Sequence, residues 1–370
     1  MSHTPPVASH PPSVAVWDRP IRLFHWSLAA SITVAAATGF LGGPEAIRWH
    51  LGAGLVAVAL VIARIIWGFT GPTHARFTDF LPRPGDVIEH LGPAAPRHLG
   101  HNPLGALMVL ALIGLVLILG VTGLAVLGGV FKTGPLAFWS FGLGRAGGEW
   151  HELAAWGVLG LVGLHLGGVA VESLRSRENL ARAMLTGEKE ARPGDVPRRE
   201  IPARGALAVF FLLVAGSGLW AANASLGARA PQGLPVALDA GYRGECSACH
   251  MAYSPSLLPA ASWTALMAGL PDHFGEDASL DAATAARIET WLATHAAETA
   301  DTLPAHAFAR TAPEAPFTLT ETPFWKRRHG DLPDSLFARA GIRSRSNCAA
   351  CHADAESGLF SPFSITIPKE

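Results

Sequence analysis

Residues 151–171 read HELAAWGVLGLVGLHLGGVAV, an apolar segment that begins with His151 and holds a second histidine, His165. A helix of about 20 apolar residues spans the hydrocarbon core of a membrane. Fourteen residues advance a helix by about 21 Å and return it to within about 40° of the starting direction. Both histidines therefore point the same way at two depths, where ionisable residues are costly and functional by default.

Four more apolar segments of similar length occur in this chain, which is 49% hydrophobic and 15% charged. Ordinary soluble proteins are about a quarter charged. The additional segments cover residues 23–41, 49–69, 104–130 and 206–222. Together with residues 153–171 they predict five membrane-spanning helices and an all-α fold, in which the first four form a bundle.

The distribution of Lys and Arg predicts the orientation, because these residues collect on the cytoplasmic side. With the N-terminus inside, the inner segments carry thirteen such residues and the outer loops carry only Arg48, Lys132 and Arg145. We expect a bacterial inner-membrane protein whose residues after 224 lie in the periplasm. Residues 1–15, rich in Pro, Ser and His, are expected to be a disordered cytoplasmic tail.

The membrane histidines match in depth two by two. His25 and His50 lie near the starts of the first two spans, and successive spans run antiparallel. His25 therefore reaches the inner depth of His165, and His50 the outer depth of His151. Isolated packing histidines would not explain this match, so we expect each pair to ligate one haem b in the bundle core.

Arg64 lies fourteen residues after His50 and shares its helix face. It is a candidate partner for a propionate of the inner haem b, and extension of its side chain to the membrane surface is the alternative. The inner loop holds further histidines that we expect to be solvated: His74, His90, His98 and His101.

All the cysteines lie in two Cys-x-x-Cys-His motifs, at residues 246–250 and 348–352. This spacing is typical of covalent haem c attachment. A disulfide framework or a zinc site would leave the following histidines to coincidence. The residues expected to hold the haem c groups are Cys246, Cys249 and His250 for the first, and Cys348, Cys351 and His352 for the second.

The second axial ligand of each haem c must come from elsewhere, and methionine is the usual alternative to histidine. From the residues alone, the candidates for the first haem are His273, His295 and Met267. No methionine follows Met267, so the second haem is expected to take a histidine. We expect His306 to be a solvated loop residue.

The outer region is expected to contain short helices, two of them at residues 260–270 and 281–297, where apolar residues recur with helical spacing. Residues 303–323 show no convincing period. We expect the haems themselves to serve as the hydrophobic core. The predicted organisation is a membrane domain at 16–175, a cytoplasmic loop at 176–203, a fifth helix at 204–224, a linker at 225–243 and a dihaem c domain at 244–370.

The membrane part resembles the prokaryotic cytochrome b561 family and the related b-type subunits of nickel–iron hydrogenases. The resemblance rests on residues 16–26 (VWDRPIRLFHW), 49–50 (WH) and 100–105 (GHNPLG), and on the helix with His151 and His165. It implies a four-helix unit with two haem b that exchanges electrons with membrane quinone. It also implies that His25, His50, His151 and His165 are the ligands, whereas the fifth span departs from the family pattern.

Residues 244–370 resemble the soluble low-potential dihaem cytochrome c family. The resemblance rests on residues 245–253 (ECSACHMAY), 273–280 (HFGEDASL) and 320–329 (TETPFWKRRH). It implies two histidines per iron, with His273 as the distal ligand of the first haem c and His329 as that of the second. Such ligation lowers the reduction potential relative to a methionine ligand.

These features predict electron transfer between membrane quinone or quinol and an extracytoplasmic redox protein, through two haem b and two haem c. Quinol:cytochrome oxidoreductase activity would be one form of this function. The alternative is a haem enzyme or sensor for superoxide, peroxide or a gas, which needs an open iron position. The sequence has enough histidines to fill every position. We expect the lipid bilayer, and no nucleic acid, among the partners.

Overall fold

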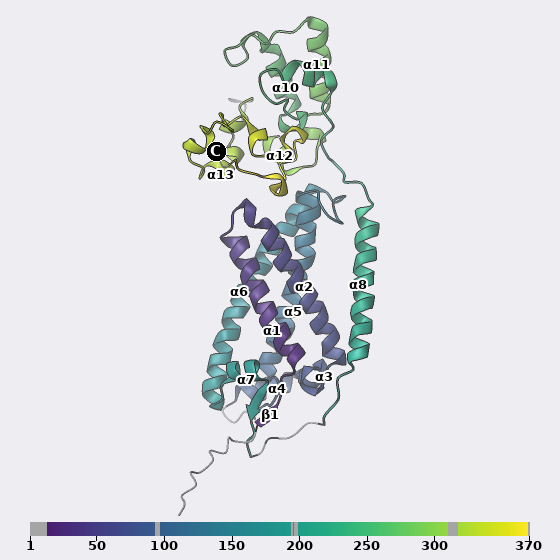
Figure 1. Cartoon of the computed structure of the whole chain (residues 1–370), viewed down its shortest axis with the longest axis vertical. Coiled ribbons are helices and arrows are strands. Elements are labelled where there is room, and N and C mark those ends of the chain that lie inside the picture. The colour runs from purple at the N-terminus through teal and green to yellow at the C-terminus, as the bar shows by residue number, and fades with distance from the viewer. Residues whose placement is uncertain (1–12, 93–96, 194, 196–198, 310–316, 369–370) are drawn as a thin grey trace, which may run out of the picture. The chain divides into compact units, whose positions relative to one another are not determined.

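The computed structural model describes residues 13–92, 97–193, 195, 199–309 and 317–368 (Figure 1). The chain divides into two compact units. The first contains residues 1–41, 49–121 and 150–221, and the second contains residues 42–48, 122–149 and 222–370. Residues 1–12 of the predicted tail lie outside the described residues, and Ser13–Ala15 form a strand instead of a disordered segment.

In the described part of the chain, five helices are long and apolar enough to cross a membrane. They are α1 (Arg19–Phe40), α2 (Ile47–Thr70), α5 (Pro103–Ala125), α6 (Phe141–Ser176) and α8 (Gly205–Gly227). A π-helical turn, η3 (Val126–Val130), extends α5. The predicted all-α fold with five membrane-capable helices is thereby confirmed.

Helix starts and close helix packing are explained by particular side chains. Asp18 caps α1 by accepting a hydrogen bond from a backbone amide of the first turn, and Asn102 does the same before α5, as expected for these residue types. Between α2 and α5, a Cβ on Gly120 would lie 2.7 Å from Val58 Cγ2. Glycine therefore allows the two helices to approach closely around the buried side chain of Val61.

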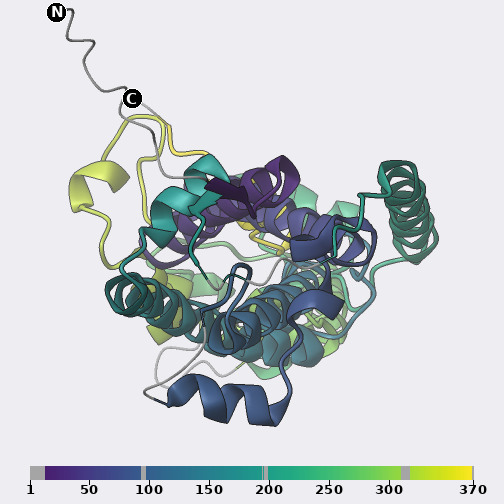
Figure 2. The same cartoon turned by 90° about the horizontal axis from the view of Figure 1, so that it is seen from below.

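Helix α8 stands apart from the other four membrane helices, as Figures 1 and 2 both show. Ala208 is its one buried residue, and the large apolar side chains of Leu213 and Trp220 are exposed. Its start is attached to the bundle by a hydrogen bond from Arg204 N to Thr70 O, 2.7 Å. An apolar helix whose large side chains are mostly exposed is suited to lipid, because its backbone hydrogen bonds are internal.

Short elements cover the loop ends of the bundle in the first unit. They are β1 (Ser13–Ala15), η2 (Thr73–Ala75), α3 (Phe77–Phe80), α4 (Pro84–Leu91), α7 (Leu180–Thr186) and β2 (Glu188–Glu190). Strands β1 and β2 pair antiparallel, with Val14 opposite Lys189. The predicted cytoplasmic loop at 176–203 thus contains a helix and a strand.

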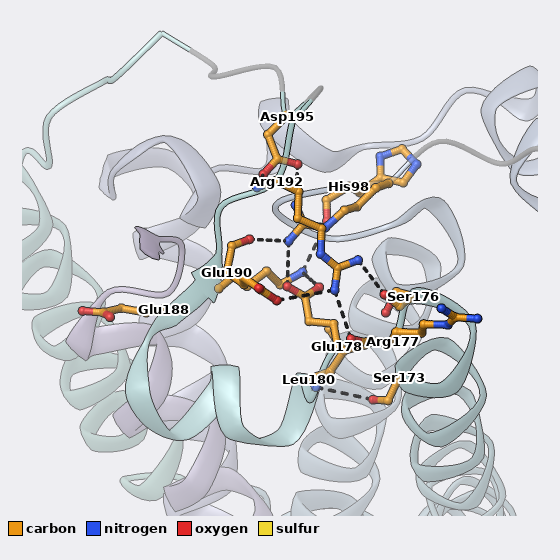
Figure 3. Close-up of polar contacts among 12 residues, drawn as sticks. His98, Ser173, Ser176, Arg177, Glu178, Leu180, Glu188, Glu190, Arg192 and Asp195 are labelled. Atoms are coloured by element: carbon orange, nitrogen blue, oxygen red, sulfur yellow. Dashed lines mark hydrogen bonds and ion pairs between the residues drawn. The ribbon is translucent and has the colours of Figure 1, made fainter. Parts of the chain in front are cut away.

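Ion pairs of Arg97 join the segment before α5 to the segment after α6. Figure 3 shows the surrounding polar contacts, with Glu178 and Asp195 labelled. The guanidinium of Arg97 bonds to Glu178 at 2.7 Å and also pairs with Asp195. Lys189 Nζ lies 3.6 Å from the same Glu178. Glu178 and Lys189 are almost wholly buried, so removing one partner would leave an uncompensated buried charge and destabilise this region.

After α8, the second unit continues as short helices joined by turns and loops. They are α9 (Ala240–Cys246), α10 (Ala260–Ala268), α11 (Ala282–Thr294), α12 (Leu303–Phe308), α13 (Pro323–His329) and α14 (Asp334–Phe337). Helix α12 lies in the stretch that showed no period. It is too short for periodicity to reveal, and it begins with a Thr302 cap and Pro304 in its first turn.

Protein side chains form a hydrophobic core between α10 and α11. Ile288 and Leu292 are fully buried, and Trp263 and Tyr242 are nearly so. The polar ends of both aromatic residues are satisfied: Trp263 donates to Pro255 O, and Tyr242 donates to a backbone carbonyl, both at 2.8 Å. The expectation that the haems alone form the core was therefore wrong for this part of the chain.

Candidate functional site

Two histidine pairs lie in the membrane bundle. The ring centres of His25 (α1) and His165 (α6) are 6.2 Å apart, and those of His50 (α2) and His151 (α6) are 6.0 Å apart. Gly39 of α1 makes room for one of these rings, because a Cβ there would lie 3.0 Å from His50 Cε1. The structure thus brings together the pairs that membrane depth predicted.

Two further pairs lie in the second unit. The ring centres of His250 and His273 are 6.1 Å apart. Those of His329, at the end of α13, and His352 are 6.2 Å apart. Each pair combines the histidine of a Cys-x-x-Cys-His motif with the histidine that the resemblance implied.

The spacing fits a metal ion held between two imidazole rings. A metal–imidazole bond is about 2 Å long, so rings on opposite sides of one ion have centres about 6 Å apart. All four pairs meet this condition. The residues present therefore fit bis-histidine haem.

Hydrogen bonds orient several of these rings. A backbone carbonyl only accepts hydrogen bonds, so a ring Nδ1 bonded to it carries the proton and Nε2 keeps its lone pair for a metal. The pairs of this kind are His50 with Ala35 (2.9 Å), His151 with Leu119 (3.1 Å), His250 with Met251 (2.7 Å) and His329 with Trp325 (3.1 Å). Sequence patterns give no signal for Ala35 and Leu119, because they lie on other helices than their histidines, whereas Met251 and Trp325 are close to their histidines in sequence.

The cysteines of both motifs form no disulfide among the described residues. Burial raises the pKa of the Cys246 and Cys348 thiols to about 11. In the same part of the chain, no three His, Cys, Asp or Glu side chains gather into a metal site.

Of the three candidates for the first haem c, the structure brings His273 opposite His250. A tight turn positions it: the next two residues, Phe274 and Gly275, have positive φ angles of 56° and 92°. His273 N donates to the carbonyl of Glu276 at 2.8 Å, which closes the turn. Burial, followed by the neighbouring His250, lowers the pKa of His273.

The other two candidates have different surroundings. His295 ends α11, and its Nδ1 donates to Trp291 O at 2.8 Å. Met267 is packed in the core between α10 and α11. His306 is on α12, where its ring stacks on Phe141 with centres 4.4 Å apart and its Nε2 lies 2.9 Å from Asp301. His306 is exposed to solvent as expected, but it lies on a helix and not in a loop.

The inner-loop histidines, in contrast, are not solvated as expected, because short elements fold over them. His90 is 3% exposed, and the His98 ring lies 5.7 Å from it. His74 Nδ1 pairs with Asp79 at 3.0 Å. The His101 ring packs against aromatic rings from two other segments.

Arg64 is buried within the first unit. Its side chain is 3% exposed, and its Nη1 is shielded from solvent without a hydrogen-bond partner. Its Cζ lies 5.1 Å from the ring centre of Phe77, in a favourable cation–π arrangement. The side chain therefore turns inward and does not extend to solvent.

Comparison with known proteins reveals two families. The sequence profile described as prokaryotic cytochrome b561 matches residues 16–187, and that of dihaem cytochrome c matches residues 242–360. A probable Ni/Fe-hydrogenase B-type cytochrome subunit from Azotobacter chroococcum is 32% identical over 211 residues, which cover 47% of this chain and 88% of that protein. The corresponding protein of Azotobacter vinelandii is 31% identical over 211 residues, with the same coverage.

Solved structures of dihaem cytochromes c are similar to the C-terminal third. One from Rhodobacter sphaeroides is 48% identical, with 34% of this chain and 98% of that chain covered and a TM-score of 0.30. One from Shewanella baltica is 37% identical, with 35% and 93% covered and a TM-score of 0.29.

Proposed function

Since the chain belongs to the prokaryotic cytochrome b561 family and continues into a dihaem cytochrome c domain, we propose that it passes electrons between membrane quinone or quinol and a redox protein outside the cytoplasm. A membrane b-type cytochrome with a dihaem c domain has a role in electron transfer. The quinone and the soluble partner are the parts that we propose.

The observation that carries the proposal is the set of four histidine pairs at 6.0–6.2 Å. His25 with His165 would hold the inner haem b, and His50 with His151 the outer one. Bound haem iron accepts and releases one electron at a time. Because each iron would have an imidazole on both sides, these residues suit electron relay better than binding of a small-molecule substrate.

Each haem c would be held by one Cys-x-x-Cys-His motif and by one histidine from outside that motif. Cys246, Cys249 and His250 would hold the first, with His273 on the other side. The second would be held by Cys348, Cys351, His352 and His329. Their role would be to hold the haem and to exclude exogenous ligands from its iron.

We further propose that the chain resides in the bacterial inner membrane, with the haem c domain in the periplasm. The excess of Lys and Arg in the segments on the N-terminal side supports this orientation. Electrons would then pass from quinol in the membrane to the outer side, or from the outer side to quinone. The reduction potentials of the partners would set the direction.

Reduction by quinol in liposomes tests this function. The purified full chain is mixed with a soluble menaquinol or ubiquinol analogue, and the b and c α-bands are followed separately. We expect both bands to become reduced, and an oxidised basic cytochrome c added outside to reoxidise them. His90→Gln, which alters a buried histidine outside the four pairs, is the matched control. Full reduction by dithionite without any reduction by either quinol would contradict the proposal.

A further inference from the structure

Two buried donors near the end of α2 have no acceptor among the described residues. Nη1 of Arg64 and Nδ1 of His101 are both shielded from solvent and unpartnered. Both side chains pack on Phe80: the Arg64 Cζ lies 5.8 Å from its ring centre, and the His101 ring centre lies 4.4 Å from it. An unsatisfied buried polar group costs about 1–3 kcal/mol, and native structures rarely retain one without a function.

We call Arg64 and His101 the donor cluster. Two glycines allow close packing beside it. A Cβ on Gly68 would lie 2.1 Å from a ring carbon of Phe77, so only glycine lets that ring lie against α2 beneath Arg64. In the loop before α5, a Cβ on Gly100 would lie 3.2 Å from His74 Nδ1. At both glycines the backbone therefore lies close to a neighbouring ring.

The nearest carboxylates are already engaged. Asp18 accepts hydrogen bonds from a backbone amide of α1 at 2.8 Å and from Trp67 Nε1 at 2.9 Å. Asp79 is bonded to His74. Within the described part of the chain, no carboxylate forms an ion pair with Arg64. A buried guanidinium without an anion is unfavourable, so the cluster is built for an acceptor that the polypeptide does not provide.

We propose that Arg64 and His101 together bind one propionate carboxylate of the inner haem b, with His101 as the second donor. This rests on the proposed function, in which His25 and His165 hold that haem. A guanidinium is well matched to a carboxylate in charge and geometry. A quinone carbonyl is uncharged and would leave the charge of Arg64 uncompensated.

His101 complements Arg64 by adding a hydrogen bond without a second positive charge. Burial, followed by the charge of Arg64, lowers the pKa of His101 to about 3. The ring is therefore neutral and has a single N–H group. The pKa of this ring is also lowered by Lys189 and His74 and raised by Asp79. The unpartnered Nδ1 is the nitrogen available to donate to the propionate.

A pair of amide substitutions tests which nitrogen donates. His101→Asn places an amide NH₂ near the position of Nδ1, whereas His101→Gln places it near that of Nε2. The readout is the midpoint potential of each b haem, resolved by low-temperature spectra of the purified full chain. We expect the inner haem potential to stay unchanged in His101→Asn and to fall in His101→Gln, His101→Leu and Arg64→Gln. The reason is that a propionate without donors stabilises the oxidised iron.

The outer haem b serves as an internal reference, and its potential should not move in any of these variants. His90→Leu is the matched control. His90 is also buried, with an unpartnered Nδ1, but it lies outside the cluster, so this variant should leave both potentials unchanged.

Two results would overturn the inference. One is an unchanged inner potential in both His101→Gln and Arg64→Gln. The other is weaker binding of a quinone analogue with unchanged potentials, which would assign the cluster to quinone. Absence of haem b from the wild-type chain would instead reject the proposed function. If the His101→Leu variant fails to assemble, the inner haem potentials of His101→Asn and His101→Gln still test the inference.

Discussion

Trp325 and His329 are stacked, with ring centres 4.6 Å apart and 16° between the ring planes. They lie one turn apart on α13, and Nδ1 of His329 donates to the Trp325 carbonyl at 3.1 Å. Trp325 is 7% exposed, so packing fixes its ring. The direction in which His329 faces His352 is therefore set by its neighbour one turn earlier.

Replacing Trp325 with Ala should loosen His329 and weaken its bond to the second haem c. Loss of a buried Trp costs about 3–5 kcal/mol of stability, so the melting temperature should also fall. Carbon monoxide binding to the reduced protein measures the fraction of open iron. Trp325→Phe retains a ring for stacking and should bind much less carbon monoxide than Trp325→Ala; equal binding would argue against the stacking role.

Exchanging His329 for Ala should open the second haem c to carbon monoxide and leave the first closed, because no other described histidine ring pairs with His352. One equivalent of carbon monoxide per chain is expected. His306→Ala is the control and should bind none, since its ring contacts Phe141 and Asp301 instead. Stoichiometric binding by the unmodified protein would favour an enzyme or sensor over an electron relay.

Single replacements of the membrane histidines should remove haem b in two classes. His25→Ala and His165→Ala should lose one and the same spectral component, and His50→Ala and His151→Ala should lose the other, because each pair holds one iron. Low-temperature spectra of the α-band distinguish the components. Loss of the same component from His25→Ala and His50→Ala would refute the pairing.

The haem content should be two b and two c per chain, from two membrane histidine pairs and two attachment motifs. Pyridine haemochrome spectra measure both types after the protein concentration is determined. Replacing Cys348 and Cys351 together with Ala should halve the covalent haem and leave the b content unchanged. A b-to-c ratio far from one in the wild-type chain would reject this scheme.

Asp301 should stabilise the second unit at neutral pH. It accepts hydrogen bonds from Phe141 N (2.8 Å), Lys132 Nζ (3.1 Å) and His306 Nε2 (2.9 Å). Burial alone would raise the pKa of Asp301, but these bonds, with that from His306 the largest, lower it overall. The stabilisation is thus complete above the unfolded-state pKa of about 3.9 and is lost as the pH falls through the lowered folded-state value.

Asp301→Asn should therefore reduce the free energy of unfolding by about 1–2 kcal/mol at pH 7. The difference from the wild type should shrink in strongly acidic solution. Thermal unfolding followed by near-ultraviolet circular dichroism at several pH values measures it. Asp277→Asn, at an exposed turn, is the control and should have little effect. A deficit that stays constant down to pH 2 would show that the charge of Asp301 is not responsible.

The pairing of the membrane histidines could be predicted from the sequence, because it depends on only two regularities of membrane helices. The helical repeat places His151 and His165 on one face, and the alternating direction of successive spans brings His25 to one depth and His50 to the other. The Cys-x-x-Cys-His spacing is similarly local. None of these inferences depends on how the loops fold.

The surroundings of the other histidines were not predictable, because they depend on contacts between distant segments. His101 is covered by Trp17 and Phe80, which come from two other parts of the chain. His306 owes its position to Phe141, more than a hundred residues earlier. Loop polarity alone predicted solvation at both positions; tertiary packing shields Nδ1 of His101 from solvent, whereas His306 remains exposed beside its new partners.

As haem b ligands, the two histidines that share α6 would also make electron transfer sensitive to the membrane voltage. His151 and His165 are separated by about 21 Å along one helix, roughly two thirds of a hydrocarbon core about 30 Å thick. At 100 mV, a charge that crosses the whole membrane changes in energy by about 2.3 kcal/mol, so an electron moving between these depths would change by about 1.5 kcal/mol. The transmembrane potential would thus drive electrons toward one face and retard them in the other direction.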